Sequence, residues 1–140
     1  NPSTRLLDIL REKMGLTAVK EGCGEGECGA CSVLKDGKLV NSCIVPIGAV
    51  QDVEIVTLEG IRDTEEGKCI IESFADSGAV QCGFCTPGMV MATAALLRKN
   101  SNPNENQIRE ALSGNLCRCT GYNMLITGIQ LAAERGVGIW

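Results

Sequence analysis

Nine cysteines are the residues of this chain whose type and spacing could do chemistry. Cys69 stands alone, and the other eight form two sets of four. The first set is Cys23, Cys28, Cys31 and Cys43, and the second is Cys82, Cys85, Cys117 and Cys119. The first set has the C-x4-C-x2-C…C spacing that is typical of plant-type [2Fe–2S] sites. Structural zinc usually prefers paired C-x2-C knuckles, which this set lacks, so its spacing predicts an iron–sulfur cluster.

Glycines surround the first three cysteines in the run from Glu21 to Cys31. A loop wrapped on a cluster must turn tightly, and glycine permits positive φ while exposing backbone N–H groups to the sulfurs. Such hydrogen bonds stabilise an anionic cluster and tune its potential. The run also matches G-x-G-x-x-G at Gly24, Gly26 and Gly29. A dinucleotide site would need a helix at the last glycine, whereas a strand-like segment follows here, so we reject that interpretation.

The dipeptide Asp36-Gly37 predicts a two-residue hairpin turn. Such a turn would pair Leu34 with Leu39 and bring Cys31 opposite Ser42. Cys43 would therefore return beside Cys31, although eleven residues lie between them in the sequence. The hairpin explains how a distant fourth ligand reaches the first set.

Composition excludes several other kinds of site. The chain has 140 residues and no histidine, which rules out Ser-His and Cys-His catalysis, His-ligated zinc, globin-type haem and Rieske clusters. The net charge of −4 disfavours nucleic acid as a partner. A secreted disulfide framework is disfavoured by the odd number of cysteines and by the lack of a visible signal peptide.

Hydrophobic spacing predicts the elements that must position these cysteines. A first helix should begin at Ser3 or Thr4, place Leu6, Leu7, Leu10 and Met14 on one apolar face, and end near Gly15. Val53 and Ile55 alternate with acidic residues and predict a short strand. The polar, glycine-flanked segment 60–68 is the candidate for a linker.

After this segment the pattern becomes helical. We expect helices near 70–78, 86–99 and 104–114, and a last one that begins at Thr120. Asn104, with Gln107 three residues later, resembles a capping box. The residues expected to face inward are Ile70, Ile71, Phe74, Ile108, Ala111, Leu112, Met124, Leu125, Ile129 and Ala132.

The second cysteine set precedes two of these helices. Cys85 and Cys119 are each followed by a threonine, Thr86 and Thr120, and each threonine is expected to cap the helix that follows. This weak repeat suggests a pseudo-twofold helix bundle with a cluster between the helix N-termini, whose partial positive charge suits an anionic core. The rival interpretation is a thioredoxin-like redox disulfide at Cys82 and Cys85, but no parallel sheet is expected here. Cys69 is expected to be a buried small hydrophobe outside both sets.

Three motifs together resemble one family. They are the run 21–31 (EGCGEGECGAC), the run 81–88 (QCGFCTPG) and the run 114–122 (GNLCRCTGY). In this order they are similar to the small iron–sulfur subunit of molybdenum hydroxylases, the group of xanthine dehydrogenase, aldehyde oxidoreductase and carbon monoxide dehydrogenase. The resemblance implies an α+β fold. A plant-ferredoxin-like β-grasp [2Fe–2S] domain over 1–62, without the family's first strands, would precede an all-α four-helix bundle that holds a [2Fe–2S] cluster over 63–140.

The resemblance also implies a function and partners. The chain would be an electron-transfer subunit with no substrate turnover and no catalytic residue of its own. It would pass electrons from the molybdopterin of a large subunit, through two [2Fe–2S] clusters, to FAD in a medium subunit of a heterotrimer. Gln81 matches the glutamine that contacts the pterin, and Cys119 matches the ligand nearest to it. We expect a cytoplasmic protein that binds neither nucleic acid nor a membrane. The alternatives are a stand-alone ferredoxin-type carrier and a zinc-stabilised interaction module.

Overall fold

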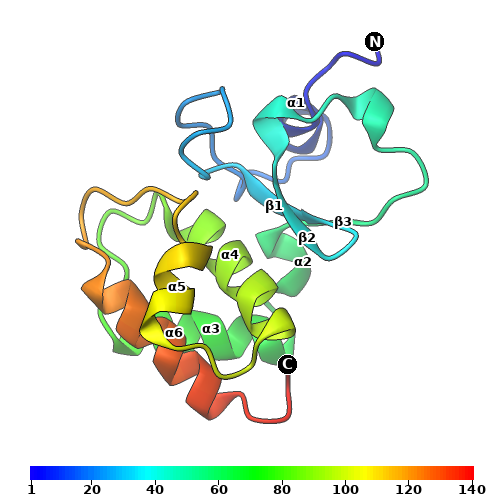
Figure 1. Ribbon diagram of the computed structural model, residues 1–140. Helices are drawn as coiled ribbons and strands as arrows, with labels where there is room; N and C mark the ends of the chain where they lie inside the picture. Colours follow the sequence, from blue (N-terminus) through cyan, green and yellow to red (C-terminus); the bar gives the residue numbers. More distant parts are fainter.

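The computed structural model describes residues 1–140 and combines a small antiparallel sheet with a larger group of helices (Figure 1). The sheet has three strands, β1 (Ser32–Lys35), β2 (Lys38–Asn41) and β3 (Ile55–Val56), in the order β2-β1-β3. The helices are α1 (Leu6–Asp8), α2 (Leu58–Ile61), α3 (Glu65–Asp76), α4 (Thr86–Lys99), α5 (Glu105–Ala111) and α6 (Asn123–Arg135). None of them is long and apolar enough to span a bilayer.

The β1–β2 hairpin has the register that the Asp36-Gly37 turn predicts. Leu34 pairs with Leu39, and Lys35 pairs with Lys38. Both turn residues have positive φ, 47° for Asp36 and 76° for Gly37, as a type I′ turn requires. β3 extends the sheet by pairing with the other edge of β1, and it contains Ile55 but not Val53, which precedes the strand.

The N-terminal helix is shorter and less regular than its apolar spacing predicted. After α1 the chain continues as a π-helical turn over Ile9–Lys13 and ends before Gly15, which has a φ of 69°. The leucines Leu6, Leu7 and Leu10 are buried as expected. Met14 was wrongly placed on this face, since it is 61% exposed. The expected cap at Ser3 or Thr4 is also wrong, because Arg5 occupies the cap position and makes no capping bond.

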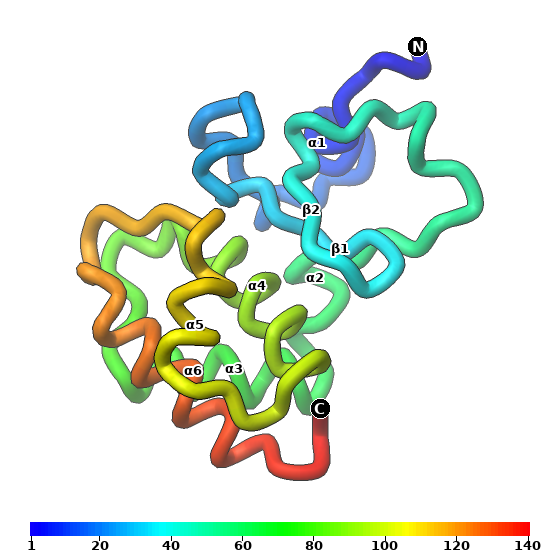
Figure 2. Tube along the Cα trace, viewed as in Figure 1, coloured from blue at the N-terminus to red at the C-terminus, as the bar shows by residue number.

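The larger core lies among α3, α4, α5 and α6. α3 packs on α4 and α6, and α5 packs on the same two helices. Phe74, Met89, Leu97 and Leu125 are among its fully buried side chains. α4 also contacts β1 and β2 (Figure 2). Leu34 of β1 belongs to this same core, so the sheet and the helices are packed against each other.

Three further expectations about the helices need correction. Segment 60–68 is more ordered than a polar linker, because it holds the end of α2 and the start of α3, where the Thr64 hydroxyl accepts from Gly67 N–H at 3.1 Å. Thr120 does not cap the last helix. The cap residue is Tyr122, whose backbone is in the left-handed conformation with φ 71°, and the helix begins after it. Thr86 is the first residue of α4 rather than its cap, which is Cys85.

Other helical expectations hold. The capping box of Asn104 and Gln107 is present in full. Most residues expected to face inward are buried, but Ala111 is only half-buried, and Ile71 (37% exposed) and Met124 (43% exposed) are exposed. Met124 lies in the first turn of α6.

Candidate metal centres

The first cysteine set lies where the loop before β1 meets the end of β2. Cys31 and Cys43 are buried, at 2% and 3% exposure, because the hairpin holds them against the small core of α1. The backbone N–H of Ser42 donates to Cys31 O at 3.2 Å, which fixes the neighbourhood that the hairpin predicted. Cys23 and Cys28 are half-buried in the glycine-rich loop.

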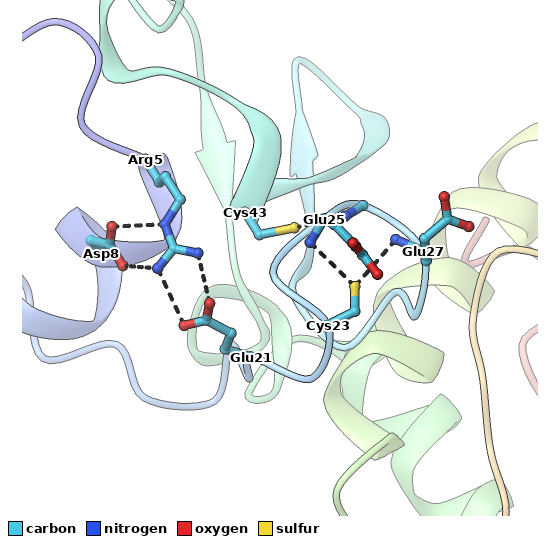
Figure 3. Close-up of polar contacts among 8 residues, drawn as sticks. Arg5, Asp8, Glu21, Cys23, Glu25, Glu27 and Cys43 are labelled. Carbon is cyan, nitrogen blue, oxygen red and sulfur yellow. Dashed lines mark hydrogen bonds and ion pairs between the residues drawn. The ribbon is translucent and has the colours of Figure 1, made fainter.

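Backbone N–H groups point at the sulfurs of this set (Figure 3). Cys23 Sγ accepts from the N–H groups of Glu25, Glu27 and Cys28 at 3.4, 3.3 and 3.4 Å. Cys43 Sγ accepts from Gly26 N–H at 3.2 Å. Gly26 has a φ of 80°, so a residue with a side chain would be strained here and would strike Ile44. The loop therefore provides the sulfur-directed amides that its glycines predicted.

The four thiols of the first set lie as two neighbouring pairs. Cys23 contacts Cys28, and Cys43 contacts Cys31. The N–H groups of Glu25 and then of Cys28 and Glu27 lower the pKa of the Cys23 thiol to about 7. Burial, and then the Cys31 thiol, raises the pKa of Cys43 to about 11. Iron would deprotonate such thiols outright, so both positions can serve as thiolate ligands.

An ion-pair network ties this loop to the first helix (Figure 3). The Arg5 guanidinium pairs with Asp8 at 2.7 Å and with Glu21 at 2.6 Å, and Glu21 lies two residues before Cys23. The bond to Arg5 holds the pKa of the Asp8 carboxyl below its usual value. The role of Arg5 in anchoring this loop could not be inferred from the sequence, because nothing in its local pattern points to a partner sixteen residues away.

The second cysteine set lies on two segments that lead into α4 and α6. Cys82 and Cys119 are exposed, and Cys85 and Cys117 are half-buried. The thiols again lie as two pairs, Cys82 with Cys119 and Cys85 with Cys117. Burial, and then the Cys117 thiol, raises the pKa of Cys85 to about 12. The two cysteine pairs of the sequence are thus brought together across the helix starts.

Thr120 and Tyr122 hold the second of these segments. The Thr120 hydroxyl donates to Cys117 Sγ at 3.1 Å and accepts from Tyr122 N–H at 3.3 Å. The Tyr122 hydroxyl accepts from Cys117 N–H at 3.0 Å and donates to Asn115 O at 2.9 Å. Burial opposes ionisation of Cys117, but the hydrogen bonds from Thr120, Cys85 and the Cys119 backbone together outweigh it and lower the pKa of this thiol.

Both sets fit a cluster with two irons. The sulfurs lie two by two, which matches a [2Fe–2S] cluster held by four thiolates, two on each iron. The Thr86 hydroxyl next to Cys85 is buried and has no hydrogen-bond partner in the protein. A hydroxyl that donates to the sulfide of a bound cluster would have this environment. If loaded, the residues of each set could therefore hold one cluster.

The two sets are joined directly by a group of hydrogen bonds, here called the seam, that no local sequence pattern indicates. Leu116 N–H donates to Cys28 O at 2.8 Å, which links the residue next to Cys117 to a cysteine of the first set. The Asn115 amide, 3% exposed, donates to Gly29 O and to the Ser32 hydroxyl, both at 3.1 Å. The partners are more than eighty residues apart in the chain, so no local pattern could have paired them.

The two remaining candidate residues, Gln81 and Cys69, take no part in the hydrogen bonds of the seam. Gln81 is exposed and directly precedes Cys82. Cys69 is half-buried on α3, where its thiol lies 3.5 Å from Ala132 O, far along the chain from both sets. Burial raises the pKa of this thiol.

Known proteins match this chain over nearly all of its length. Residues 1–54 match a family model described as a 2Fe-2S iron–sulfur cluster binding domain, and residues 57–130 match one described as a [2Fe-2S] binding domain. The nicotinate dehydrogenase small FeS subunit of Eubacterium barkeri is 49% identical over 96% of this chain and 85% of its own length. The xanthine dehydrogenase iron–sulfur-binding subunit of Escherichia coli O157:H7 is 49% identical over 91% and 81%. The chain belongs to the small iron–sulfur subunits of the molybdenum hydroxylases.

Solved structures agree with this membership. Quinoline 2-oxidoreductase from Pseudomonas putida 86 matches this iron–sulfur subunit with a TM-score of 0.92 and 40% identity, over 99% of this chain and 86% of that one. Aldehyde oxidoreductase from Desulfovibrio gigas matches all of it with a TM-score of 0.93 and 38% identity, over 16% of the longer chain. The mixed fold of helices and a small sheet is therefore that of the iron–sulfur parts of these enzymes.

Proposed function

We propose that this iron–sulfur subunit relays electrons from a molybdopterin centre, through two [2Fe–2S] clusters of its own, to FAD in a partner subunit. Cys23, Cys28, Cys31 and Cys43 would hold the first cluster, and Cys82, Cys85, Cys117 and Cys119 the second. Each cluster, when bound, would supply one-electron redox chemistry. The chain's own contribution is to hold the thiolates, direct donors at the sulfurs and keep the two sets close together.

One observation carries the proposal, the joining of two complete thiol sets at one seam. Leu116 N–H donates to the backbone carbonyl of Cys28, and Leu116 directly precedes Cys117 in the chain. A stand-alone ferredoxin needs the first set alone, so it gives no reason for a second set held against the first. A relay between two external cofactors needs both.

The partner subunits are inferred from the relatives. Nicotinate and xanthine dehydrogenase relatives are named as small or iron–sulfur-binding subunits, which implies larger chains beside them. For this chain we propose a large subunit with molybdopterin near the second set and a medium subunit with FAD near the first. The exposure of Cys82 and Cys119 supports this placement, since a redox partner must come close to a cluster.

We propose a division of the fold at residues 62 and 63. Residues 1–62 would form the ferredoxin-like β-grasp part, and residues 63–140 the four-helix bundle. The mutual packing of α3, α4, α5 and α6 supports the bundle, and the two matched family models adjoin nearby, at residues 54 and 57. The three-stranded sheet with its cysteine loop supports the ferredoxin-like part.

Gln81 is proposed as the contact between this chain and the pterin. Its backbone is tied to Cys82, its side chain is exposed, and an amide offers both a donor and an acceptor. Gln81→Ala should leave both clusters intact but weaken molybdenum retention by about 1–3 kcal/mol if the pterin is buried. It should also slow reduction of the second cluster in rapid mixing. Gln130→Ala, an exposed glutamine on α6, is the control. Unchanged molybdenum content and transfer rate in Gln81→Ala would refute the contact.

Spin counting tests the central proposal. The chain, purified anaerobically with its partners, should contain about four irons and four labile sulfides and show two distinct signals after dithionite, each integrating to about one spin. A single spin per chain would instead indicate a one-cluster ferredoxin, and stoichiometric zinc would indicate an interaction module. Elution of the chain from its native host without molybdenum-bearing and FAD-bearing subunits would refute the relay.

A further inference from the structure

The Thr120 hydroxyl has a defined orientation. A hydroxyl has one proton to donate, and it accepts through its lone pairs. Tyr122 N–H occupies the acceptor side of Thr120 Oγ1 at 3.3 Å, which leaves its proton free for Cys117 Sγ at 3.1 Å. When Cys117 is a thiolate ligand it has no proton to give, so the Thr120 hydroxyl is the donor of this bond.

A strained residue keeps this arrangement in place. Tyr122 has a φ of 71°, a left-handed conformation that costs a non-glycine residue energy and persists only where surrounding contacts enforce it. Here those contacts are visible, because the Tyr122 hydroxyl bonds both Cys117 N–H and Asn115 O. The same turn that directs Tyr122 N–H at Thr120 thus anchors the backbone of Cys117.

The two thiol sets differ in the source of their sulfur-directed donors. In the first set the donors to Cys23 and Cys43 are all backbone N–H groups, which no substitution of a side chain removes. In the second set, Cys117 Sγ receives the Thr120 side-chain hydroxyl in addition to the backbone N–H groups of Thr120 and Cys119. The hydroxyl is therefore a donor at Cys117 that a single substitution can delete.

We propose that Thr120 is a positioning residue that raises the reduction potential of the second cluster by hydrogen-bonding Cys117 Sγ. This rests on the proposed function, in which Cys117 is a ligand of that cluster. One-electron reduction adds one negative charge to the cluster and its thiolates, so a donor at the sulfur stabilises the reduced form more than the oxidised form. This hydrogen bond involves no covalent step, and it needs no further reactant.

The experiment is a redox titration of the assembled enzyme, with the two cluster signals followed separately by electron paramagnetic resonance. Thr120→Val removes the hydroxyl at nearly constant volume, and Thr120→Ser keeps it. In Thr120→Val the equilibrium constant for reducing the second cluster should fall about threefold to tenfold, or about 28–59 mV at 59 mV per decade for one electron. Thr120→Ser should restore most of this shift, and the first cluster should keep its potential as an internal reference.

Thr127→Val is the matched control, because Thr127 is an exposed threonine of α6 whose hydroxyl bonds only Asn123 O, at 3.1 Å. It should shift neither potential. A wild-type enzyme without a second cluster signal would refute the proposed function rather than this inference. With that signal present, an unchanged potential in Thr120→Val would overturn the role of Thr120. Loss of the second cluster in both Thr120→Val and the smaller Thr120→Ala would also overturn it, because Thr120 would then be structural.

Discussion

Gly88→Ala should destabilise the seam between the two cysteine sets, although alanine is the better helix residue. Gly88 lies in the first turn of α4, and a Cβ built on it would come within 2.4 Å of Gly29 O. The gain in helix propensity is at most about 1 kcal/mol. The sign of the change in stability therefore shows whether the backbone at the seam can shift enough to accommodate the added Cβ.

The carbonyl of Gly29 has little freedom to move away. It accepts from Asn115 Nδ2 at 3.1 Å and from the Ser32 hydroxyl at 2.7 Å. Gly29 itself packs closely against Gly114, since a Cβ on Gly29 would lie 2.4 Å from Gly114 O. Overpacking costs about 1–3 kcal/mol, and weakening one of these hydrogen bonds costs about 1 kcal/mol more. After the propensity gain, the net destabilisation should be about 1–3 kcal/mol.

The assay is the rate at which the visible absorbance of the clusters disappears in guanidinium, because cluster loss makes unfolding irreversible. If the seam opens before the unfolding barrier, this rate should rise about fivefold to 160-fold, since 1.4 kcal/mol is a factor of ten. Gly114→Ala is the control, as its Cβ would meet nothing within 4 Å, and it should change stability by less than about 0.5 kcal/mol. A Gly88→Ala protein as stable as the wild type, or more stable, would refute the tight seam.

Further substitutions test the division of the cysteines and the anchoring of the first loop. Cys69→Ser should keep full iron content and change stability by about 1 kcal/mol, because Cys69 is only half-buried against the helical core and a serine can still bond Ala132 O; iron loss would show that Cys69 is a ligand. Cys43→Ser should remove or strongly perturb the first cluster signal alone, and an equal loss of both signals would contradict two separate sets. Arg5→Met should speed the loss of the first cluster more than the second, since it removes the ion pairs to Asp8 and Glu21; Lys13→Met is the exposed control, and equal rates for both clusters would contradict the anchoring role.

Local features were predictable from the sequence because their cause is local. The register of the hairpin follows from the two residues of its turn, and the capping box at Asn104 is complete within four residues. Helix ends were less predictable. Thr120 has the residue type of a cap, but its hydroxyl bonds a cysteine sulfur, and the cap position belongs to Tyr122 in a conformation that its residue type disfavours.

The exposed apolar residues show a second limit of prediction from the sequence. Met14 and Met124 fit the helical spacing of their apolar faces, yet both are largely exposed. Spacing gives the direction of a side chain relative to its helix, but not whether another element covers that direction. Near the second cysteine set Val80, Phe84 and Leu116 are also exposed, at 44%, 47% and 57%. These side chains contribute nothing to the core of this chain, so core spacing could not have accounted for them.

The seam shows why a site can be read from residue types while the contact that joins its halves cannot. The bond from Leu116 N–H to Cys28 O uses only backbone atoms, and almost any residue at position 116 could make it. Residue identity matters only around this bond. Gly29 and Gly88 must lack a Cβ for two backbones to meet, and Asn115 must carry an amide that satisfies a buried carbonyl and a buried hydroxyl. These residues lie in three segments that are far apart in the sequence, so their shared role emerges only when the chain has folded the segments together.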